Sequence, residues 1–186
     1  MTSNDPSYLS ADGIDIREAS GLIDPRYDLP VRSEMLPNLW MGGTDYNDRT
    51  EFPMVKPFIT AEDFDAVYTF YGNANPVDWL VEEYRYAFFD SERHKLDPTK
   101  LKRAVLMAYD DWKSGKRVLI RCQAGLNRSG IVTALVLMRS GMTADNAIEH
   151  IRTERDSYCL YNNYFTNFLR RQDPLEWLDP ELSNPE

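Results

Sequence analysis

One stretch near the middle of the chain constrains the fold more than any other: "RVLIRCQAGLNRSGIVTALVLMRSG", residues 117–141. Its first part is an apolar, β-branched run that predicts a buried strand. Its last part is apolar nearly all round, which is typical of a helix buried in a core. Because a buried strand and a buried helix must both be covered by other elements, this stretch predicts a layered α/β fold.

Further strands and helices are predicted on both sides of this stretch. Strands are expected in "EMLPNLWMGG", "FDAVYTFYG" and "YRYAFFD", with "RVLIRC" as the fourth. A helix is predicted between Pro98 and Gly115, where apolar residues recur at three- and four-residue steps. Thr143 is expected to cap a helix in "ADNAIEHIRTER", and "NNYFTNFLRR" predicts a last helix. This order predicts an α/β fold, a single domain with a central, mostly parallel sheet covered by helices.

The length of 186 residues fits one domain. Residues 1–33 are polar and rich in Asp, Ser and Pro, so we expect an N-terminal arm or irregular lead-in there. The folded domain is expected over residues 34–172. Residues 173–186 carry prolines and several acids, and they predict an acidic C-terminal tail.

The composition excludes several classes of protein. The net charge of −9 argues against nonspecific binding to nucleic acids or membranes, since both attract basic surfaces. Cys122 and Cys159 are too few for a disulfide framework or a cysteine-rich zinc site. The first residues lack a basic and apolar leader, and no apolar stretch approaches the length of a membrane span. We therefore expect a cytoplasmic protein with no membrane partner, and the charge disfavours nucleic acid as a partner.

The loop between the predicted strand and helix carries groups suited to phosphate chemistry. A loop at a helix N-terminus directs backbone N–H groups and a partial positive charge toward one point, which holds an anion and stabilises a thiolate. Cys122 supplies the thiol, and Arg128 supplies a planar guanidinium that can bind two phosphate oxygens. Gly125 and Gly130 permit the tight backbone that such a ring of amides requires.

These residues carry a resemblance to a known family. "CQAGLNRSG" resembles the C-x5-R-[ST] phosphate-binding loop of the cysteine-dependent protein phosphatases, and we call residues 122–128 the phosphate loop. "LPNLWMGG" resembles the opening strand of the dual-specificity branch, and "YRYAFFDSERHKL" resembles its general-acid segment. "IRTERDSYCLYNNYFTNFL" resembles its closing helices, with an Asn-x-x-Phe element at Asn162 and Phe165. The resemblance spans roughly residues 35–171, and it implies a protein tyrosine phosphatase-like fold with residues 34–172 as the catalytic domain.

The resemblance also implies roles for individual residues. Cys122 attacks phosphorus as a thiolate and forms a phosphocysteine intermediate. Asp90 protonates the leaving oxygen and then deprotonates the attacking water, and Ser129 donates a hydrogen bond to the sulfur. No metal or diffusible cofactor is needed. The phosphate would be bound by the backbone amides of the phosphate loop and by the arginine side chain: Gln123, Ala124, Gly125, Leu126, Asn127 and Arg128.

Some assignments keep an alternative at this stage. Glu92 and Asp97 lie close to Asp90 and are of the same chemical type. Arg155 occupies a position where the family often has an arginine, or it is an ordinary surface charge. At residue 121 the family usually has histidine and this chain has arginine. We expect Cys122 to ionise below neutral pH nonetheless, because the loop amides and the helix dipole dominate its environment.

The function implied is a phosphatase that hydrolyses phosphate monoesters on proteins. Its substrate would be phosphotyrosine, with phosphoserine and phosphothreonine added if the pocket is shallow. "GLNRSG" also resembles the loop of RNA 5′-triphosphatase relatives, so a phosphatase acting on RNA or another non-protein substrate is a second hypothesis. A phosphate-binding pseudophosphatase, which captures phosphorylated segments without hydrolysing them, is a third hypothesis from a different class.

Overall fold

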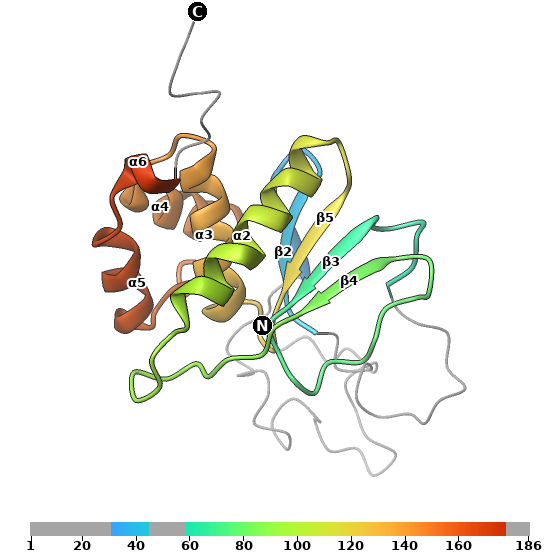
Figure 1. Cartoon of the computed structure of the whole chain (residues 1–186), viewed down its shortest axis with the longest axis horizontal. Helices are drawn as coiled ribbons and strands as arrows, with labels where there is room; N and C mark the ends of the chain where they lie inside the picture. The colour runs from blue at the N-terminus through green and yellow to red at the C-terminus, as the bar shows by residue number, and fades with distance from the viewer. Residues whose placement is uncertain (1–30, 45–58, 178–186) are drawn as a thin grey trace, which may run out of the picture.

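A computed structural model describes residues 31–44 and 59–177, which fold into one α/β domain (Figure 1). At its centre is a five-stranded sheet in the order β1-β2-β5-β3-β4. β1 pairs antiparallel with β2, and the other neighbours in the sheet are parallel. The predicted mostly parallel sheet is therefore confirmed. The strands are β1 (Arg32–Leu36), β2 (Leu39–Gly42), β3 (Ala66–Thr69), β4 (Glu82–Arg85) and β5 (Val118–Arg121).

The segment predicted as one strand followed by a turn forms a hairpin of two strands, β1 and β2. The turn lies at Pro37 and Asn38, and Asn38 has a positive φ of 67°. Proline followed by a residue that tolerates positive φ is typical of a type II turn, in which the two residues occupy the central positions. Leu36 and Leu39 are paired directly across this turn.

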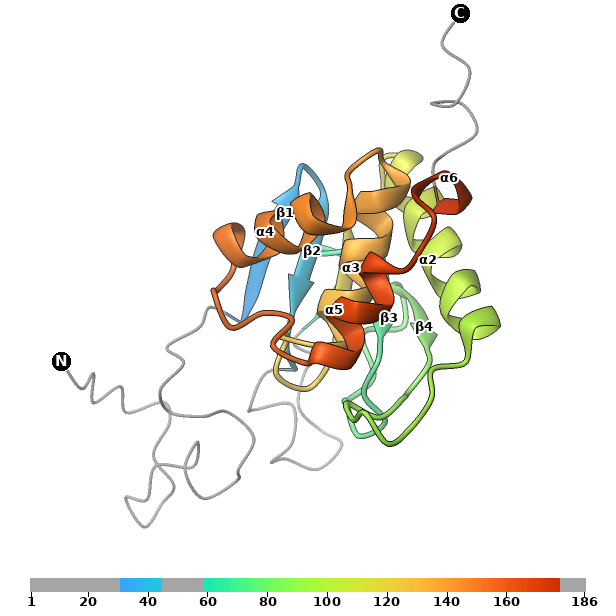
Figure 2. The ribbon, with the colours of Figure 1, turned by 90° about the vertical axis from the view of Figure 1, so that its left-hand side faces the viewer.

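The described helices lie on one face of the sheet (Figures 1 and 2). Central among them is α3, which contacts α2, α4, α5 and α6. All ten residues of α3 from Ser129 to Met138 are buried, which explains why its sequence is apolar nearly all round. The helices are α2 (Pro98–Lys113), α3 (Arg128–Arg139), α4 (Ala144–Glu154), α5 (Asn163–Arg170) and α6 (Pro174–Trp177).

Helix boundaries follow local capping. The Asp97 carboxylate accepts hydrogen bonds from the N–H groups of Thr99 and Lys100, and Pro98 occupies the first turn of α2. Thr143 accepts a hydrogen bond from the N–H of Asn146 at 3.2 Å, which confirms it as the cap of α4. The Asp97 side chain is therefore occupied as the N-cap of α2.

The two faces of the sheet carry separate hydrophobic clusters. Side chains alternate between faces along a strand. Ile120 and Cys122 belong to the large core beneath the helices. Leu119 faces the other way and packs in a smaller cluster with Val67 and Ile59. In the part of the chain that the structure describes, helices cover the first face and loop residues cover the second.

Two predicted boundaries differ from the structure. The strand predicted in "YRYAFFD" ends at Arg85, and the chain then continues without strand pairing to Asp90. The segment predicted as a tail begins with α6, whose Trp177 is only 4% exposed and belongs to the main core. Most of the predicted lead-in, residues 1–30, and residues 178–186 lie outside the described residues.

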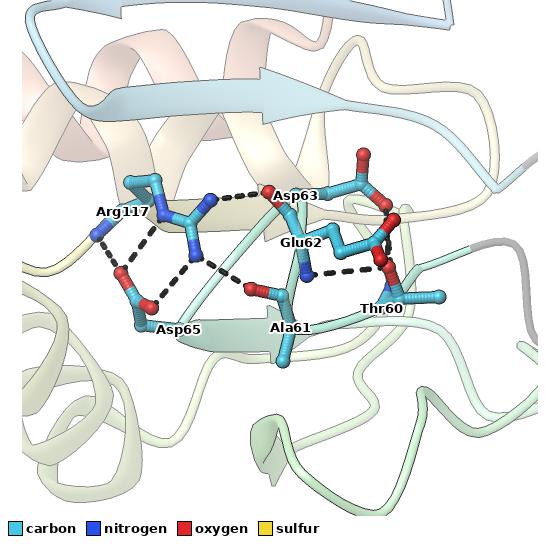
Figure 3. A network of polar contacts seen from close by, with 6 residues as sticks. All are labelled: Thr60, Ala61, Glu62, Asp63, Asp65 and Arg117. Carbon is cyan, nitrogen blue, oxygen red and sulfur yellow. Dashed lines mark hydrogen bonds and ion pairs between the residues drawn. The ribbon is translucent and has the colours of Figure 1, made fainter.

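The amino ends of β3 and β5 are joined by a polar network around Arg117 (Figure 3). Its guanidinium forms an ion pair with Asp65 at 2.9 Å and donates to the carbonyl groups of Ala61 and Glu62. The Arg117 side chain and its backbone N–H both donate to the Asp65 carboxylate, and these bonds lower the pKa of Asp65 to about 2. This network closes the edge of the sheet opposite to the site described next.

None of the helices in residues 31–44 and 59–177 combines the length and apolar character that a membrane crossing requires.

Candidate active site

The predicted site residues gather at the carboxyl ends of the parallel strands. Cys122 directly follows β5, Phe70 follows β3, and the chain after β4 leads to Asp90. The turn that follows β2, residues 42–44, lies against the phosphate loop. Ligands bind at this edge in open α/β sheets, because loops from neighbouring strands converge there.

The backbone of the phosphate loop is tightly curved and is held from outside. Gly125 has a φ of 69°, and a side-chain carbon at this position would lie 2.4 Å from Gly43 N. The Gln123 carbonyl accepts a hydrogen bond from Thr44 N–H at 3.0 Å. The Leu126 carbonyl accepts one from Leu160 N–H at 3.3 Å. The surrounding structure therefore binds the carbonyl groups of the loop.

The N–H groups of the same loop are left available. Within residues 31–44 and 59–177, none of the backbone N–H groups of residues 123–127 donates a hydrogen bond. Buried N–H groups without an acceptor are rare in folded proteins, and successive ones form an anion-binding concavity. The loop also leads into α3, whose N-terminus adds partial positive charge. An oxyanion is the ligand that this arrangement fits.

Cys122 lies at the base of the phosphate loop. Its backbone N–H donates to Gly42 O at 3.2 Å, which continues the strand pairing to the first residue of the loop. The thiol is 2% exposed, and its Sγ lies 3.3 Å from the Oγ of Ser129 in the first turn of α3. The hydroxyl can therefore donate a hydrogen bond to the sulfur, as the sequence predicts.

Arg128 lies beside the loop with part of its guanidinium unengaged. Its Nη2 donates to Gln123 Oε1 at 3.2 Å, and the guanidinium lies 5.2 Å from the ring centre of Tyr71. Its Nε is buried and finds no acceptor among the described residues. A buried guanidinium N–H without an acceptor is costly unless a ligand occupies the site. This side chain thus adds a further donor to those of the backbone.

Asp90 is brought to the loop by two asparagines. Asn127 of the phosphate loop donates through Nδ2 to Asp90 Oδ2 at 3.1 Å. Asn162, at the N-terminus of α5, donates through Nδ2 to Asp90 Oδ1 at 2.7 Å. Of the three acids that the sequence left open, Asp97 caps α2, and Asp90 is the one with a hydrogen bond to the loop among the described residues.

Arg155 supports the loop from behind, a role that the sequence left undecided. It is 8% exposed, and its Nε donates to Gly125 O at 2.6 Å. Its Nη1 donates to Ser33 Oγ at 3.2 Å, which ties the loop to β1. Burial lowers the pKa of Arg155 below its usual value. The surface-charge interpretation of Arg155 is therefore wrong.

Leu160 is a second supporting residue, and nothing in the sequence indicated it. It has a φ of 57°, a left-handed conformation that a leucine adopts only at a cost of roughly 1–2 kcal/mol. Its side chain packs on Gly130, where an added side-chain carbon would lie 3.0 Å from Leu160 Cγ. Gly130 therefore makes room for the Leu160 side chain. The sequence predicted that both Gly125 and Gly130 are needed for a tight backbone, and it is Gly125 that has the positive φ.

Arg121, which stands where the resembling family usually has histidine, faces away from the loop. It is 1% exposed and donates through Nε to Thr69 Oγ1 at 2.9 Å. Its Nη2 lies 3.1 Å from Glu83 Oε1. Since its charge is paired with a carboxylate on the other face of the sheet, it does not stand in for a cation beside the sulfur.

Cys159 and the two histidines of the chain have contacts that indicate a structural role. Cys159 is fully buried, and burial raises its pKa to about 12. His150 contacts the Met35 carbonyl at 2.6 Å, and the ring of His94 stacks on Phe89. Across the described ranges, no three His, Cys, Asp or Glu side chains gather as a metal ion would require.

Three solved structures illustrate the likeness of the fold. Human DUSP28 superposes with a TM-score of 0.61 at 19% identity, covering 76% of this chain and 92% of that one. A mouse putative dual specificity phosphatase, complexed with zinc tungstate, gives 0.60 at 21% identity and covers 82% and 94%. PTPMT1 in complex with PI(5)P gives 0.59 at 17% identity and covers 76% and 93%. At these identities the likeness concerns the fold, and it confirms a protein tyrosine phosphatase-like architecture.

Among curated protein sequences none matches the chain. The family model of the dual specificity phosphatase catalytic domain matches residues 74–173, which is more than half of the 186 residues. The matched region begins within the loop that follows β3 and ends at the residue before α6, and it includes the whole phosphate loop. The chain therefore belongs to the dual specificity phosphatase catalytic-domain family.

Proposed function

We propose that this protein hydrolyses phosphate monoesters on proteins through a phosphocysteine intermediate. The observation that carries the proposal is the set of five successive loop N–H groups that have no acceptor among the described residues. They belong to the residues that directly follow Cys122 at the end of β5. A phosphate dianion would accept hydrogen bonds from these groups and from Arg128 while its phosphorus faces the thiol.

In the first step the Cys122 thiolate attacks phosphorus, and the bond between phosphorus and the leaving oxygen breaks. The loop amides and the Arg128 guanidinium stabilise the charge on the three other oxygens during this transfer. In the second step water attacks the phosphocysteine, phosphate leaves and the thiolate returns. A hydrogen bond from Ser129 Oγ, 3.3 Å from the sulfur, favours thiolate departure in this step.

Asp90 serves as the general acid and then as the general base. Its two oxygens each accept one amide N–H, from Asn127 and Asn162. A carboxyl oxygen has two lone pairs, so each retains a site for the proton that the reaction moves. The asparagines hold the group at the loop, which a module that only binds phosphate does not require.

Phosphoproteins are favoured over inositol lipids by the side chains around the site. Apart from Cys122, which reacts as a thiolate, Arg128 is the one residue of the phosphate loop with a charged side chain. The exposed rings of Phe89 and Tyr161 directly precede Asp90 and Asn162 in the sequence. Apolar rings beside the acid suit a peptide segment or an aryl leaving group better than the highly charged head group of a phosphoinositide.

The test compares hydrolysis of five substrates by the wild type and by Cys122→Ser. These are para-nitrophenyl phosphate, a phosphotyrosine peptide, a phosphoserine peptide, vesicles containing PI(5)P, and RNA with a 5′-triphosphate. We expect hydrolysis of the first two at the highest kcat/KM and none by the variant. Phosphopeptide binding without turnover would mean that the protein is a binding module. A higher kcat/KM for the vesicles or the RNA would mean that its substrate is a phosphoinositide or RNA and not a protein.

The assignment of Asp90 makes a separate prediction. Asp90→Asn should lower kcat for the phosphoserine peptide by about 100-fold or more, because its alkoxide leaving group needs a proton. The loss for para-nitrophenyl phosphate should be much smaller, because nitrophenolate leaves without one. Glu92→Gln, which changes an exposed acid two residues away, is the matched control and should leave both rates unchanged. Equal losses on both substrates in Asp90→Asn would remove Asp90 from this role.

A further inference from the structure

A buried ion pair lies behind the phosphate loop, on the face of the sheet opposite Cys122. Arg121 Nη2 and Glu83 Oε1 are 3.1 Å apart, and the two side chains are 1% and 13% exposed. Thr69 Oγ1 donates to the same carboxylate oxygen at 2.6 Å and accepts from Arg121 Nε at 2.9 Å. The loop that follows β3 joins this group, because Asn75 O accepts from Arg121 Nη2 at 2.6 Å.

This group fixes the last residue of β5 before the phosphate loop. Arg121 is in register with Thr69 of β3, and Glu83 belongs to β4, so three strands are tied together by side chains. The Arg121 carbonyl also accepts from Phe70 N–H at 2.8 Å. The next residue is Cys122, whose position therefore follows from that of Arg121.

The pair also balances a charge close to the thiol. An unpaired guanidinium one residue from Cys122 would stabilise the thiolate, and an unpaired carboxylate there would destabilise it. Arg85 Nε also lies 3.3 Å from Glu83 Oε1, but its side chain is 39% exposed and so more strongly screened by solvent. The buried cation and the buried anion offset each other.

We propose that Glu83 and Arg121 act as a positioning pair for the nucleophile, holding the end of β5 while Glu83 offsets the buried charge of Arg121. This inference rests on the proposed function, in which Cys122 reacts as a thiolate. It assigns to Glu83, a residue of β4 that is outside the phosphate loop, an influence on how readily Cys122 ionises. The thiolate is then stabilised by the loop amides and α3 and not by the residue at position 121.

Other polar and charged groups lie around the phosphate loop and are the same in every variant of the pair. Arg128 and Ser129 approach from α3, Arg155 from the end of α4, and Asp90 from the segment after β4. The buried thiol of Cys159 lies in the same core. Differences between variants of the pair therefore report the pair itself.

The test measures the pH midpoint of Cys122 alkylation by iodoacetamide in the wild type, Glu83→Gln and Arg121→Met. Cys122→Ser gives the background reaction of Cys159. Glu83→Gln keeps the shape and the acceptor oxygen but removes one negative charge near the thiol, so the midpoint should fall. Arg121→Met removes one positive charge near the thiol, so the midpoint should rise. Each shift should be about one pH unit, the effect of a unit charge across roughly 10 Å at an effective dielectric constant of about 20.

Opposite shifts distinguish charge balance from a purely structural role. If the pair only stiffened the strand, both variants would loosen the loop and both midpoints would rise. The double variant Arg121→Met/Glu83→Gln removes both charges, and its midpoint should return to within a few tenths of a pH unit of the wild type. Shifts in the same direction, or none, would overturn the proposal. Should Arg121→Met fail to fold, Glu83→Gln alone decides, because a rise or no change in its midpoint contradicts the proposal.

Alkylation needs no turnover, so this test is independent of the phosphatase assay. If the wild type has no hydrolytic activity, the proposed function is wrong, but opposite shifts in the variants would still support the positioning pair. If the wild type is active and both substitutions leave the midpoint unchanged, the proposed function stands and the positioning pair is wrong.

Discussion

Gly125 is the residue of the phosphate loop that tolerates a side chain least. Its φ is 69°, and an added side-chain carbon would lie 2.4 Å from both Gly42 C and Gly43 N and 2.6 Å from Arg155 Nη2. Gly125→Ala combines a left-handed strain of roughly 1–2 kcal/mol with a backbone collision, so the loop must move. We expect KM for para-nitrophenyl phosphate to rise about tenfold or more, since the loop amides would no longer converge.

Gly72→Ala is the matched control for this prediction. Gly72 lies two residues after Phe70, and an added carbon there meets nothing closer than Ala87 Cβ at 3.6 Å. Its kinetics should equal those of the wild type. If Gly125→Ala also kept the wild-type KM, the curvature at Gly125 would not matter for phosphate binding.

At the level of single residues, the sequence indicated the groups that we propose to contact the phosphate, left the role of Arg155 undecided and gave no indication of Glu83. Cys122, Arg128 and Ser129 fall within eight contiguous residues, so their spacing alone places them together at one turn between a strand and a helix. Arg155 and Glu83 are distant in sequence and are charged residues of types that usually lie on the surface. Their burial follows from tertiary packing against the loop and the sheet, which no local pattern encodes.

Among the elements, α5 contributes to the site through its N-cap residue, Asn162. Asn162 Oδ1 accepts from Tyr164 N–H at 3.0 Å, which caps the helix, while its Nδ2 donates to Asp90. Asn162→Asp keeps the capping oxygen but replaces the donor with a carboxylate that faces Asp90. We expect the acid to be displaced and kcat for the phosphoserine peptide to fall about tenfold, with a midpoint of thermal unfolding close to that of the wild type.

Asn163→Asp serves as the matched control, because it introduces the same charge at the adjacent, exposed position. A negative charge in the first turn of a helix is favourable, so neither rate nor stability should fall. Equal losses in the two variants would mean that charge near α5, and not the contact with Asp90, sets the rate.

Whole elements were predictable where one pattern dominated. The apolar stripe between Pro98 and Gly115 correctly predicted α2, and the stretch that is apolar nearly all round correctly predicted the buried helix α3. β4 was predicted too long because residues 86–89 are aromatic and apolar, which resembles a strand. The rings of Tyr86 and Phe88 pack against each other, and Phe88 packs on Phe165 of α5 at 6.0 Å, so the apolar character serves side-chain packing without strand pairing.

Across the whole molecule, the two ends of the strands have different roles: the carboxyl ends carry the candidate site, and the amino ends contribute to stability. The carboxyl ends of the strands present loop N–H groups that have no acceptor within residues 31–44 and 59–177, whereas the amino ends are closed by the Arg117 network (Figure 3). Groups left unsatisfied for a ligand lower stability, so other parts of the domain must supply it. Substitutions at the amino edge should therefore change stability while leaving the site intact.

Asp65→Asn tests this separation through its dependence on pH. Arg117 holds the pKa of Asp65 at about 2, below its usual value of ~4. A carboxyl whose pKa is lowered on folding stabilises the protein above its unfolded value and loses that contribution as pH falls toward its folded value. We expect Asp65→Asn to unfold at a lower temperature than the wild type at pH 7, with the difference shrinking between about pH 4 and pH 2. Asp145→Asn, which removes an exposed partner of Arg170, should change little at any pH, and kcat/KM should match the wild type in both variants. A stability difference that stayed constant down to pH 2 would mean that the carboxylate charge of Asp65 is not what holds this edge of the sheet.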